Sequence, residues 1–369
     1  MKIVFACGGT GGHIFPAFSV AEELKKRDPR TEIIYVCGKK DIEHAIFKIV
    51  AGEKVVPIES AMFGGALSLF NPSFLIKLFS GFRQANGFLK KEKPDLVVGF
   101  GGYFSFPAVF IAKWLNIRTL IHEQNAVPGM ANKFLSRFVD GIALSFPDTA
   151  EHLSGKNRFR VTGNPVRASI ENVSREEALR FFNFSGDKIT ILVLGGSQGS
   201  ESINGFFLEA MNFIAEDLMA RIQVLHLCGK MPIEATESAF SKFGVAGKAY
   251  SFFERMDLAY GATDIAIGRA GATFLAEIAV KNIPAILIPY PYGSGHQLVN
   301  AKAFGRTRDS VLIEQKDLTP ESLAGRLVEY IQKVEENRRD HRFAKPDRSE
   351  SSNARELLAD FIEETIQRK

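Results

Sequence analysis

The chain contains two copies of one local pattern, in which an apolar run typical of a buried strand leads into a glycine-rich turn and then a helical periodicity. The first copy joins residues 2–7 to the turn at 8–12, and the second joins residues 188–194 to the turn at 195–199. A strand, a tight turn and a helix in this order begin a βα unit, whose strands pair in parallel. The repeated pattern therefore predicts two Rossmann-like domains, one starting at each turn.

Short runs of β-branched and aromatic residues alternate with helical patterns along the rest of the chain. This alternation predicts an α/β fold with a doubly wound parallel sheet in each half. The strands are expected at residues 2–7, 32–38, 54–58, 95–100, 118–122 and 141–146, and again at 188–194, 223–228, 248–253, 264–268, 284–288 and 311–314.

The boundary between the domains is expected near residues 162–165, where glycine, asparagine and proline interrupt the alternation. The predicted domains are residues 1–163 and residues 164–350. A last helix carries Leu357, Leu358, Phe361 and Ile362 on one face. This helix, within residues 351–369, is expected to return to the first domain and complete it.

Composition limits the class of protein. The 369 residues are 46% hydrophobic and 24% charged, as expected for two packed domains, and the net charge of +4 does not indicate a nucleic-acid partner. Cys7, Cys37 and Cys228 are odd in number and widely spaced, which favours reduced thiols. No signal peptide or membrane-spanning run is expected. Neither a D-x-D pair nor a Cys/His cluster occurs, so we expect no metal and no other cofactor.

The two glycine turns exclude some common enzyme classes. Neither has the G-x-G-x-x-G spacing of dinucleotide-binding folds, and G-x-x-x-x-G-K-[ST] is absent, so a dehydrogenase or a P-loop enzyme is disfavoured. Glycines let the backbone approach an anion, and the following helix directs its free N–H groups at it. The need for a tight connection between a strand and a helix is enough to explain a single turn of this kind. Two turns at the start of two similar domains favour a phosphate-bearing ligand in a cleft between the domains.

Candidate chemistry in the first domain follows its strands. His13 ends the first glycine turn, where an open α/β sheet exposes its ligand crevice. Histidine accepts a hydroxyl proton well near neutral pH, although an isolated histidine is more often structural. The polar run at residues 122–125, HEQN, directly follows a predicted strand and either lines the crevice or caps the next helix.

The second domain contains a more specific arrangement. Residues 269–273, RAGAT, leave a predicted strand and enter a helix whose N-terminus is free to bind phosphate oxygens. One turn later, Glu277 either accepts hydrogen bonds from two ribose hydroxyls or complements the positive helix end. Gln297 and Asn300 follow another strand and are expected to face a sugar. Without a metal, helix ends and backbone amides would stabilise a departing diphosphate.

Together these motifs resemble the MurG family, the transferases that add N-acetylglucosamine to the lipid-linked muramyl-pentapeptide precursor of peptidoglycan. Seven motifs occur in order over nearly the whole chain: GGTGGH at 8–13, GGY at 101–103, HEQN at 122–125, GNPVR at 163–167, GGSQG at 195–199, RAGAT at 269–273 and HQ at 296–297. The resemblance implies a GT-B glycosyltransferase fold and inverting transfer from UDP-N-acetylglucosamine to the 4-hydroxyl of the muramyl sugar. It also implies a peripheral enzyme at the cytoplasmic face of the cell membrane, with other cell-wall synthesis proteins as possible partners.

The resemblance also implies roles for individual residues. His13 would be the general base, and the donor would lie mainly in the second domain. The substrate-binding residues would be Thr10, Gly11, Gly12 and Asn125 for the sugar or diphosphate, Arg167, Ser197 and Gln198 for the donor, the backbone of Phe253 for uracil, Ala272, Thr273, Phe274 and Leu275 for the phosphates, Glu277 for the ribose, and Gln297 for the N-acetylglucosamine hydroxyls.

Two residues depart from the family pattern. Phe274 stands where some relatives have a threonine, and its ring cannot donate a hydrogen bond to phosphate, so the backbone amides of this turn are the expected ligands. Phe253 replaces an aliphatic residue, which should matter little if its role is carried by the backbone.

Three alternative functions remain open from the sequence. They are a related transferase with another lipid acceptor such as diacylglycerol, a UDP-N-acetylglucosamine 2-epimerase of the same architecture, and a non-catalytic membrane scaffold. The HEQN and GGTGGH motifs favour the muramyl acceptor, and intact His13, Glu277 and Gln297 argue against the scaffold.

A stretch within the first domain is predicted to dock on an anionic membrane. Residues 60–91 include six phenylalanines and four basic residues but no acidic residue. Leu75, Phe79 and Phe82 share one helical face, which Lys77 and Arg83 flank. Such a stripe is usually part of a core, but basic residues near an anionic leaflet gain about 1 kcal/mol each. We therefore predict that residues 62–91 contact the membrane.

Overall fold

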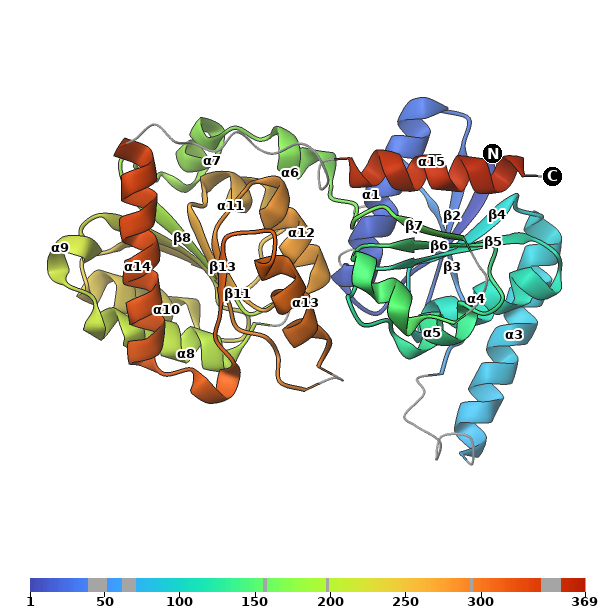
Figure 1. The fold of residues 1–369 in the computed structure, drawn as a ribbon, viewed down its shortest axis with the longest axis horizontal. Coiled ribbons are helices and arrows are strands. Elements are labelled where there is room, and N and C mark those ends of the chain that lie inside the picture. Colours follow the sequence, from blue (N-terminus) through green and yellow to red (C-terminus); the bar gives the residue numbers. More distant parts are fainter. Residues whose placement is uncertain are drawn as a thin grey trace. The chain divides into compact units, whose positions relative to one another are not determined.

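The structure of the protein, a computed structural model, describes residues 1–38, 52–61, 71–154, 158–196, 199–292, 295–339 and 353–368. These residues form two compact units (Figure 1). The first unit runs from Met1 to Arg167 and includes the C-terminal helix α15 (Ala354–Gln367), and the second unit begins at Ala168. The predicted boundary had placed Asn164 to Arg167 in the second domain, whereas the structure places them in the first unit.

In the described part of the chain, the first unit contains a seven-stranded parallel sheet in the order β3-β2-β1-β4-β5-β6-β7. The order reverses direction between β1 and β4, which is where ligands bind in open α/β sheets. Its strands are β1 (Lys2–Ala6), β2 (Glu32–Cys37), β3 (Lys54–Pro57), β4 (Leu96–Gly99), β5 (Arg118–Glu123), β6 (Gly141–Leu144) and β7 (Arg158–Val161).

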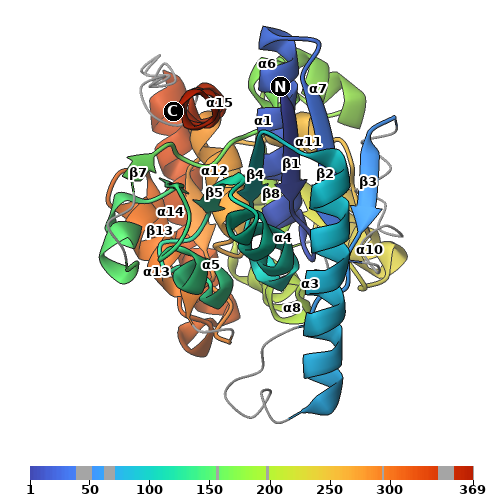
Figure 2. The same ribbon diagram turned by 90° about the vertical axis from the view of Figure 1, so that its right-hand side faces the viewer.

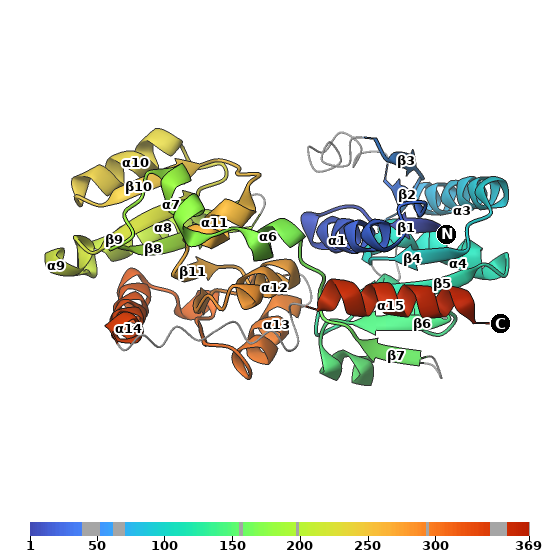
Figure 3. The ribbon, with the colours of Figure 1, turned by 90° about the horizontal axis from the view of Figure 1, so that it is seen from above.

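Helices cover both faces of this sheet, because alternate side chains along each strand point to opposite faces. Ile3 and Phe5 pack with helices α1 and α15, which lie side by side (Figure 3), whereas Val4 and Ala6 pack with α3 and α4. Asn71 caps α3 by accepting a hydrogen bond from the Ser73 amide. The helices are α1 (Gly11–Arg27), α3 (Pro72–Glu92), α4 (Gly102–Trp114), α5 (Met130–Leu135), the 3₁₀ turn η2 (Pro147–His152) and α15.

The second unit repeats this plan. Its described residues form a six-stranded parallel sheet in the order β10-β9-β8-β11-β12-β13, which reverses direction between β8 and β11. The strands are β8 (Ile189–Leu194), β9 (Ile222–Leu227), β10 (Ala246–Tyr250), β11 (Ile265–Gly268), β12 (Ala285–Leu287) and β13 (Ser310–Leu312).

One face of the second sheet packs against α8 and α14, where Ile191 and Val193 meet Leu327 and Ile331 in a single core. The helical segments are α6 (Ala168–Asn172), α7 (Arg175–Phe182), α8 (Glu201–Ala210), η3 (Met211–Phe213), α9 (Glu216–Met219), α10 (Ile233–Lys242), α11 (Met256–Ala262), α12 (Ala272–Val280), α13 (His296–Gly305), η4 (Gln315–Asp317) and α14 (Pro320–Arg339).

The predicted fold class is confirmed, since each predicted strand has a counterpart in one of two parallel sheets. Two corrections concern the strands. The edge strand β7 was not predicted, and β10 spans Ala246–Tyr250 rather than residues 248–253. Phe253 therefore lies beyond the strand, and its ring packs on Tyr250 and Phe182 at centroid distances of 4.8 and 5.4 Å.

Candidate active site

The candidate residues of the first unit follow the carboxyl ends of three strands that are neighbours in the sheet. The loop after β1 leads to His13, the loop after β4 contains Gly101, and Gln124 follows β5. Because β1, β4 and β5 are adjacent and parallel, these loops emerge at the same edge of the sheet, beside the point where the strand order reverses.

The His13 imidazole is held by the backbone of its own loop. Nδ1 lies 3.2 Å from the Gly8 carbonyl oxygen and 3.4 Å from Thr10 Oγ1. A carbonyl oxygen can only accept, so Nδ1 carries the proton and donates to Gly8. The lone pair of neutral His13 is therefore on Nε2. That tautomer is the one a general base needs when Nε2 faces the reacting hydroxyl.

Gly101 supports the other side of the imidazole. Its φ is +88°, and a Cβ at this position would lie 3.2 Å from His13 Cδ2 and 3.3 Å from His13 Nε2. A larger residue would therefore be strained in its backbone and would crowd the ring. The GGY motif thus contributes close packing against His13, a role that its sequence alone did not reveal.

A buried hydrogen-bond network lies beneath His13. His122 is fully buried, and its Nε2–H donates to the Gly163 carbonyl at 3.0 Å while its Nδ1 accepts from Gln124 Nε2 at 3.0 Å. Burial lowers the pKa of His122 to about 4, so the ring is neutral near neutral pH. His122 consequently serves as a fixed structural element and not as a second base.

Glu123 holds the loop that follows β5. This carboxylate is 2% exposed and accepts hydrogen bonds from the amide and side chain of Asn125, the Gly129 amide and Asn132 Nδ2, at 2.8 to 3.1 Å. The side-chain NH2 of Asn125 is therefore already bound to Glu123. His122, Glu123 and Gln124 are buried, and Glu123 binds the Gly129 amide at the start of α5, so the helix-capping interpretation of the HEQN run describes this carboxylate.

Arg167 belongs to the first unit, and its guanidinium lies over the Phe15 ring at 4.3 Å. A cation over an aromatic ring is attracted by the negative face of the ring, which helps to hold the guanidinium in place.

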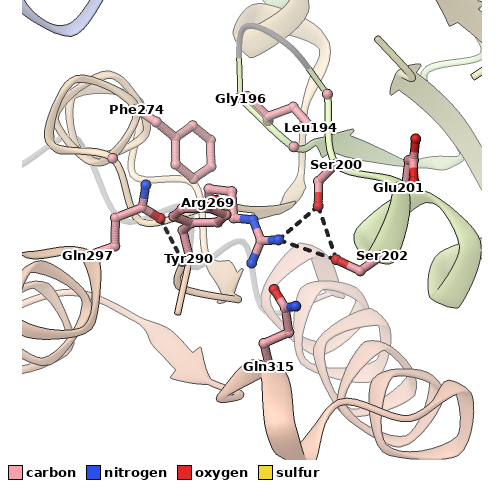
Figure 4. Close-up of a pocket in the computed structure, with 13 residues that line it drawn as sticks. Leu194, Gly196, Ser200, Glu201, Ser202, Arg269, Phe274, Tyr290, Gln297 and Gln315 are labelled. Carbon is pink, nitrogen blue, oxygen red and sulfur yellow. Dashed lines mark hydrogen bonds between the residues drawn. The ribbon is translucent and has the colours of Figure 1, made fainter. Parts of the chain in front are cut away.

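The second unit contains a cavity of about 520 Å³ at the carboxyl ends of β8, β11, β12 and β13, shown in Figure 4. This position includes the reversal of strand order between β8 and β11, as expected for a ligand site. The walls are the turn after β8, the starts of α8 and α12, and side chains from the next two loops. The side chains that line it include Arg269, Phe274, Tyr290, Gln297 and Gln315.

Arg269 is the central charged group of this cavity. It is 8% exposed and donates to the carbonyls of Ile288 and Pro289 at 3.1 and 3.2 Å, and to the hydroxyls of Ser200 and Ser202 at 2.8 and 3.2 Å. None of these partners is a carboxylate, and burial lowers the pKa of Arg269. The N-termini of α8 and α12 add positive potential at the same cavity. Glu201, in the first turn of α8, is the one carboxylate among the described residues that line the cavity, so the balance of charge there is positive and suits an anion.

Two predicted donor residues line the cavity. Gln297 Oε1 accepts a hydrogen bond from the Tyr290 amide at 2.9 Å, which leaves its NH2 as the group able to donate to a ligand. The Phe274 ring forms part of the wall. As expected from its chemistry, the ring offers an apolar surface and no hydrogen-bond donor.

Other predicted donor residues are placed elsewhere in the second unit. Glu277 is 6% exposed and accepts a hydrogen bond from the buried Tyr260 hydroxyl at 2.8 Å, outside the residues that line the cavity. Ala272 and Leu275 are buried, and Thr273 is partly exposed, in the first turn of α12. Ser197 and Gln198 lie outside the described residues.

Asn300 does not have the position that the sequence suggested. Its side chain is fully buried in α13 and donates to the Ala270 carbonyl at 3.3 Å. It therefore braces the turn before α12 and does not face a sugar in the cavity.

Among the lining residues that sequence reasoning did not assign are the side chains of Arg269, Tyr290 and Gln315. Arg269 carried a usable signal, because a charged residue directly after a buried strand lies at the ligand edge of the sheet. Tyr290 and Gln315 follow β12 and β13 in the same way, Tyr290 in a segment rich in proline and glycine and Gln315 at the start of η4.

Comparison with known proteins agrees with this architecture. The family models for the glycosyltransferase family 28 N-terminal and C-terminal domains match residues 3–144 and 190–361. A relative from Halothermothrix orenii, named UDP-N-acetylglucosamine--N-acetylmuramyl-(pentapeptide) pyrophosphoryl-undecaprenol N-acetylglucosamine transferase, is 38% identical over 375 residues, 99% of each chain. A relative of the same name from Syntrophus aciditrophicus is 37% identical and covers 89% of this chain and 90% of its own. The crystal structure of Acinetobacter baumannii MurG superposes with a TM-score of 0.71 at 26% identity, covering 98% of this chain and 99% of that one.

Proposed function

Because this chain belongs to the MurG family of glycosyltransferases, we propose that it transfers N-acetylglucosamine from UDP-N-acetylglucosamine to the 4-hydroxyl of the muramyl sugar in undecaprenyl-pyrophosphoryl-N-acetylmuramyl-pentapeptide. The observation that carries the proposal is the cavity of the second unit. There, a buried guanidinium without a carboxylate partner among the described residues meets two helix N-termini. A nucleotide diphosphate supplies the negative charge that this arrangement lacks.

The donor is proposed to bind to the second unit. Arg269 and the first amides of α12, from Ala272 to Leu275, would hold the diphosphate, and Ser197 and Gln198 would contact it from the turn after β8. Glu277 would accept hydrogen bonds from the ribose hydroxyls, the backbone of Phe253 would recognise uracil, and the Gln297 amide would donate to the N-acetylglucosamine. As the bond to the sugar breaks, the same positive groups would stabilise the departing UDP.

The acceptor sugar is proposed to bind to the first unit, at the start of α1 and at the loop after β5, where Thr10, Gly11, Gly12 and Asn125 lie. Arg167 is a further proposed donor contact. His13 Nε2 takes the proton of the acceptor 4-hydroxyl while that oxygen forms a bond to the anomeric carbon. The bond from the anomeric carbon to the UDP oxygen breaks in the same step, and UDP leaves with its electron pair. Attack opposite to the leaving group inverts the configuration at the anomeric carbon.

The polyprenyl tail of such an acceptor stays in a lipid bilayer, so we propose that the first unit docks on the cytoplasmic face of the membrane. In the described residues, no helix is long and apolar enough to cross a bilayer. A docking surface is instead proposed on the first turns of α3 and on the adjacent α4 and α5, with Ile76, Phe79 and Phe134 being 69%, 72% and 41% exposed. Lys77 and Lys133 supply basic groups on the same helices. The part of the predicted contact at residues 62–70 lies outside the described residues.

The direct test uses labelled UDP-N-acetylglucosamine with the lipid-linked muramyl-pentapeptide, and analyses both the lipid and the nucleotide-sugar products. Appearance of label in the lipid with release of UDP is the expected result. Formation of UDP-N-acetylmannosamine without acceptor would instead indicate a 2-epimerase, and transfer to diacylglycerol alone would indicate another acceptor class.

A further inference from the structure

Gln124 presents a buried carbonyl oxygen whose orientation is determined by the groups around it. The side chain is 2% exposed, and its Nε2 lies 2.9 Å from the Phe100 carbonyl oxygen and 3.3 Å from the His122 carbonyl oxygen. Only the NH2 end of an amide can bond to carbonyl oxygens, so the amide cannot be reversed. Among the described residues, Oε1 has no hydrogen-bond partner. Leaving such a group unsatisfied costs about 1–3 kcal/mol, which makes a ligand partner favourable.

This oxygen lies beside the proposed general base. Gln124 Oε1 and His13 Nε2 are each 3.3 Å from the position that a Cβ would occupy on Gly101. The two atoms are therefore separated by at most twice that distance. When one hydroxyl of a sugar binds His13 Nε2, a neighbouring hydroxyl of the same sugar can therefore reach Gln124 Oε1.

Resting on the proposed function, we infer that Gln124 Oε1 accepts a hydrogen bond from the 6-hydroxyl of the muramyl sugar and so directs the 4-hydroxyl to His13 Nε2. An amide oxygen requires a donor, and of the groups adjacent to the 4-hydroxyl on this sugar, the 3-position carries an ether without a hydrogen. The primary 6-hydroxyl is the remaining neighbour that can donate. Gln124 is therefore an acceptor-binding residue that positions the sugar for proton removal.

The same amide connects this contact to the rest of the first unit. Its NH2 is bound to Phe100 and His122, and His122 in turn donates to the Gly163 carbonyl. Rotation of Gln124 would break these bonds, so Oε1 is held in place before the substrate binds. A preorganised acceptor of this kind discriminates strongly against an analogue that lacks the matching hydroxyl.

The inference is tested by combining a variant with an acceptor analogue. Wild type, Gln124→Met and Asn132→Leu are each assayed for kcat/KM with the normal acceptor and with its 6-deoxy analogue. Asn132 is a matched control, because it is a buried amide that also binds the His122 carbonyl and lacks a partner for its oxygen among the described residues, yet nothing places it beside His13. The three proteins are compared by circular dichroism before assay.

We expect the wild type and Asn132→Leu to lose about 10- to 100-fold in kcat/KM on the 6-deoxy acceptor, the usual loss for one hydrogen bond left unmade. Gln124→Met should be slower on the normal acceptor but should lose less than about threefold on removal of the 6-hydroxyl, since its partner is already gone. An equal penalty in Gln124→Met and wild type would overturn the inference. So would the absence of a penalty in wild type, a result that needs no variant to fold. If wild type transferred nothing to the normal acceptor, the proposed function itself would be wrong.

Discussion

At the scale of single residues, the carbonyl of Gly8 determines the chemistry available to His13. By accepting the Nδ1 proton it leaves the lone pair on Nε2, as a carboxylate does in other histidine bases. We predict that His13→Ala lowers kcat by about 10²- to 10⁴-fold, because loss of a general base acts on the transition state. Steady-state kinetics with UDP affinity measured in parallel would test this. Turnover within a few-fold of wild type would assign the base to another group.

Glu277 allows a second prediction. Its Oε2 already accepts a hydrogen bond from Tyr260, so the carboxylate is oriented before any ligand binds. If it accepts ribose hydroxyls, Glu277→Ala should weaken UDP binding by about 10- to 100-fold, the usual loss for hydrogen bonds to a charged group. Calorimetry with UDP and 2′-deoxy-UDP measures the binding affinity of each ligand for wild type and variant. In the variant the two ligands should bind alike, and unchanged UDP affinity would remove Glu277 from the ribose site.

Single residues also show where sequence reasoning ends. Gln297 was assigned to the donor and does line the cavity, because its place at the start of the helix after β12 followed from the strand pattern. Arg269 was not assigned, since its partners Ser200 and Ile288 come from loops distant in the sequence. Asn300 was expected to face a sugar, yet it binds the Ala270 carbonyl in the interior. Whether a polar side chain faces the cavity or the interior depends on packing between segments that are distant in the sequence. A local sequence pattern does not describe that packing.

At the scale of elements, α3 has two different halves. Its second half packs on the first sheet through Ala85 and Leu89, whereas its amino-terminal turns extend past α4 (Figure 2). The predicted stripe of Leu75, Phe79 and Phe82 is therefore divided. Leu75 and Phe79 are exposed, but the Phe82 ring stacks on Phe110 at 5.4 Å. Replacing Phe82 would test packing as well as docking.

The third prediction uses the exposed half of α3. Ile76→Ser combined with Phe79→Ser should reduce binding to vesicles that contain anionic phospholipid, because about 1.5–3 kcal/mol of apolar transfer energy is lost per side chain. Transfer to a soluble short-chain acceptor should remain. Phe213→Ser, at a 53% exposed phenylalanine of the second unit, is the control and should bind vesicles like wild type. Equal vesicle binding by the double variant and wild type would place docking elsewhere.

The strands were easier to predict than the helix surfaces. Buried strands such as residues 189–194 read as continuous apolar runs, since both faces of a parallel sheet are covered. The edge strand Arg158–Val161 escaped prediction because it is short and two of its four residues are arginines. Those arginines pair with Glu364 on α15, a partner that lies more than 200 positions away in the sequence.

At the scale of the whole molecule, each unit has one fully buried histidine among the residues that the structure describes. His122 in the first unit and His226 in the second are both fully buried, and burial lowers the pKa of each to about 4. His226 Nε2–H donates to Asn204 Oδ1, and its Nδ1 has no partner among the described residues. Protonation would therefore place an unpaired charge between Phe207 and Phe240.

These histidines give the folded chain a predictable sensitivity to acid. In the unfolded chain a histidine has a pKa of about 6.5, so between that pH and about 4 the unfolded state binds the additional proton. The contribution of each neutral buried histidine to the free energy of unfolding is thus fully present above pH 6.5. It is lost as the pH falls toward 4, by up to about 3 kcal/mol for each histidine. Urea unfolding at pH 7.5 and pH 5 measures this loss. His226→Gln retains a donor for Asn204 but does not titrate, so its stability should fall by about 2 kcal/mol less than that of wild type over this interval. His152→Gln, at an exposed histidine, should behave as wild type. An equal loss of stability in His226→Gln and wild type would show that protonation of His226 does not drive acid unfolding.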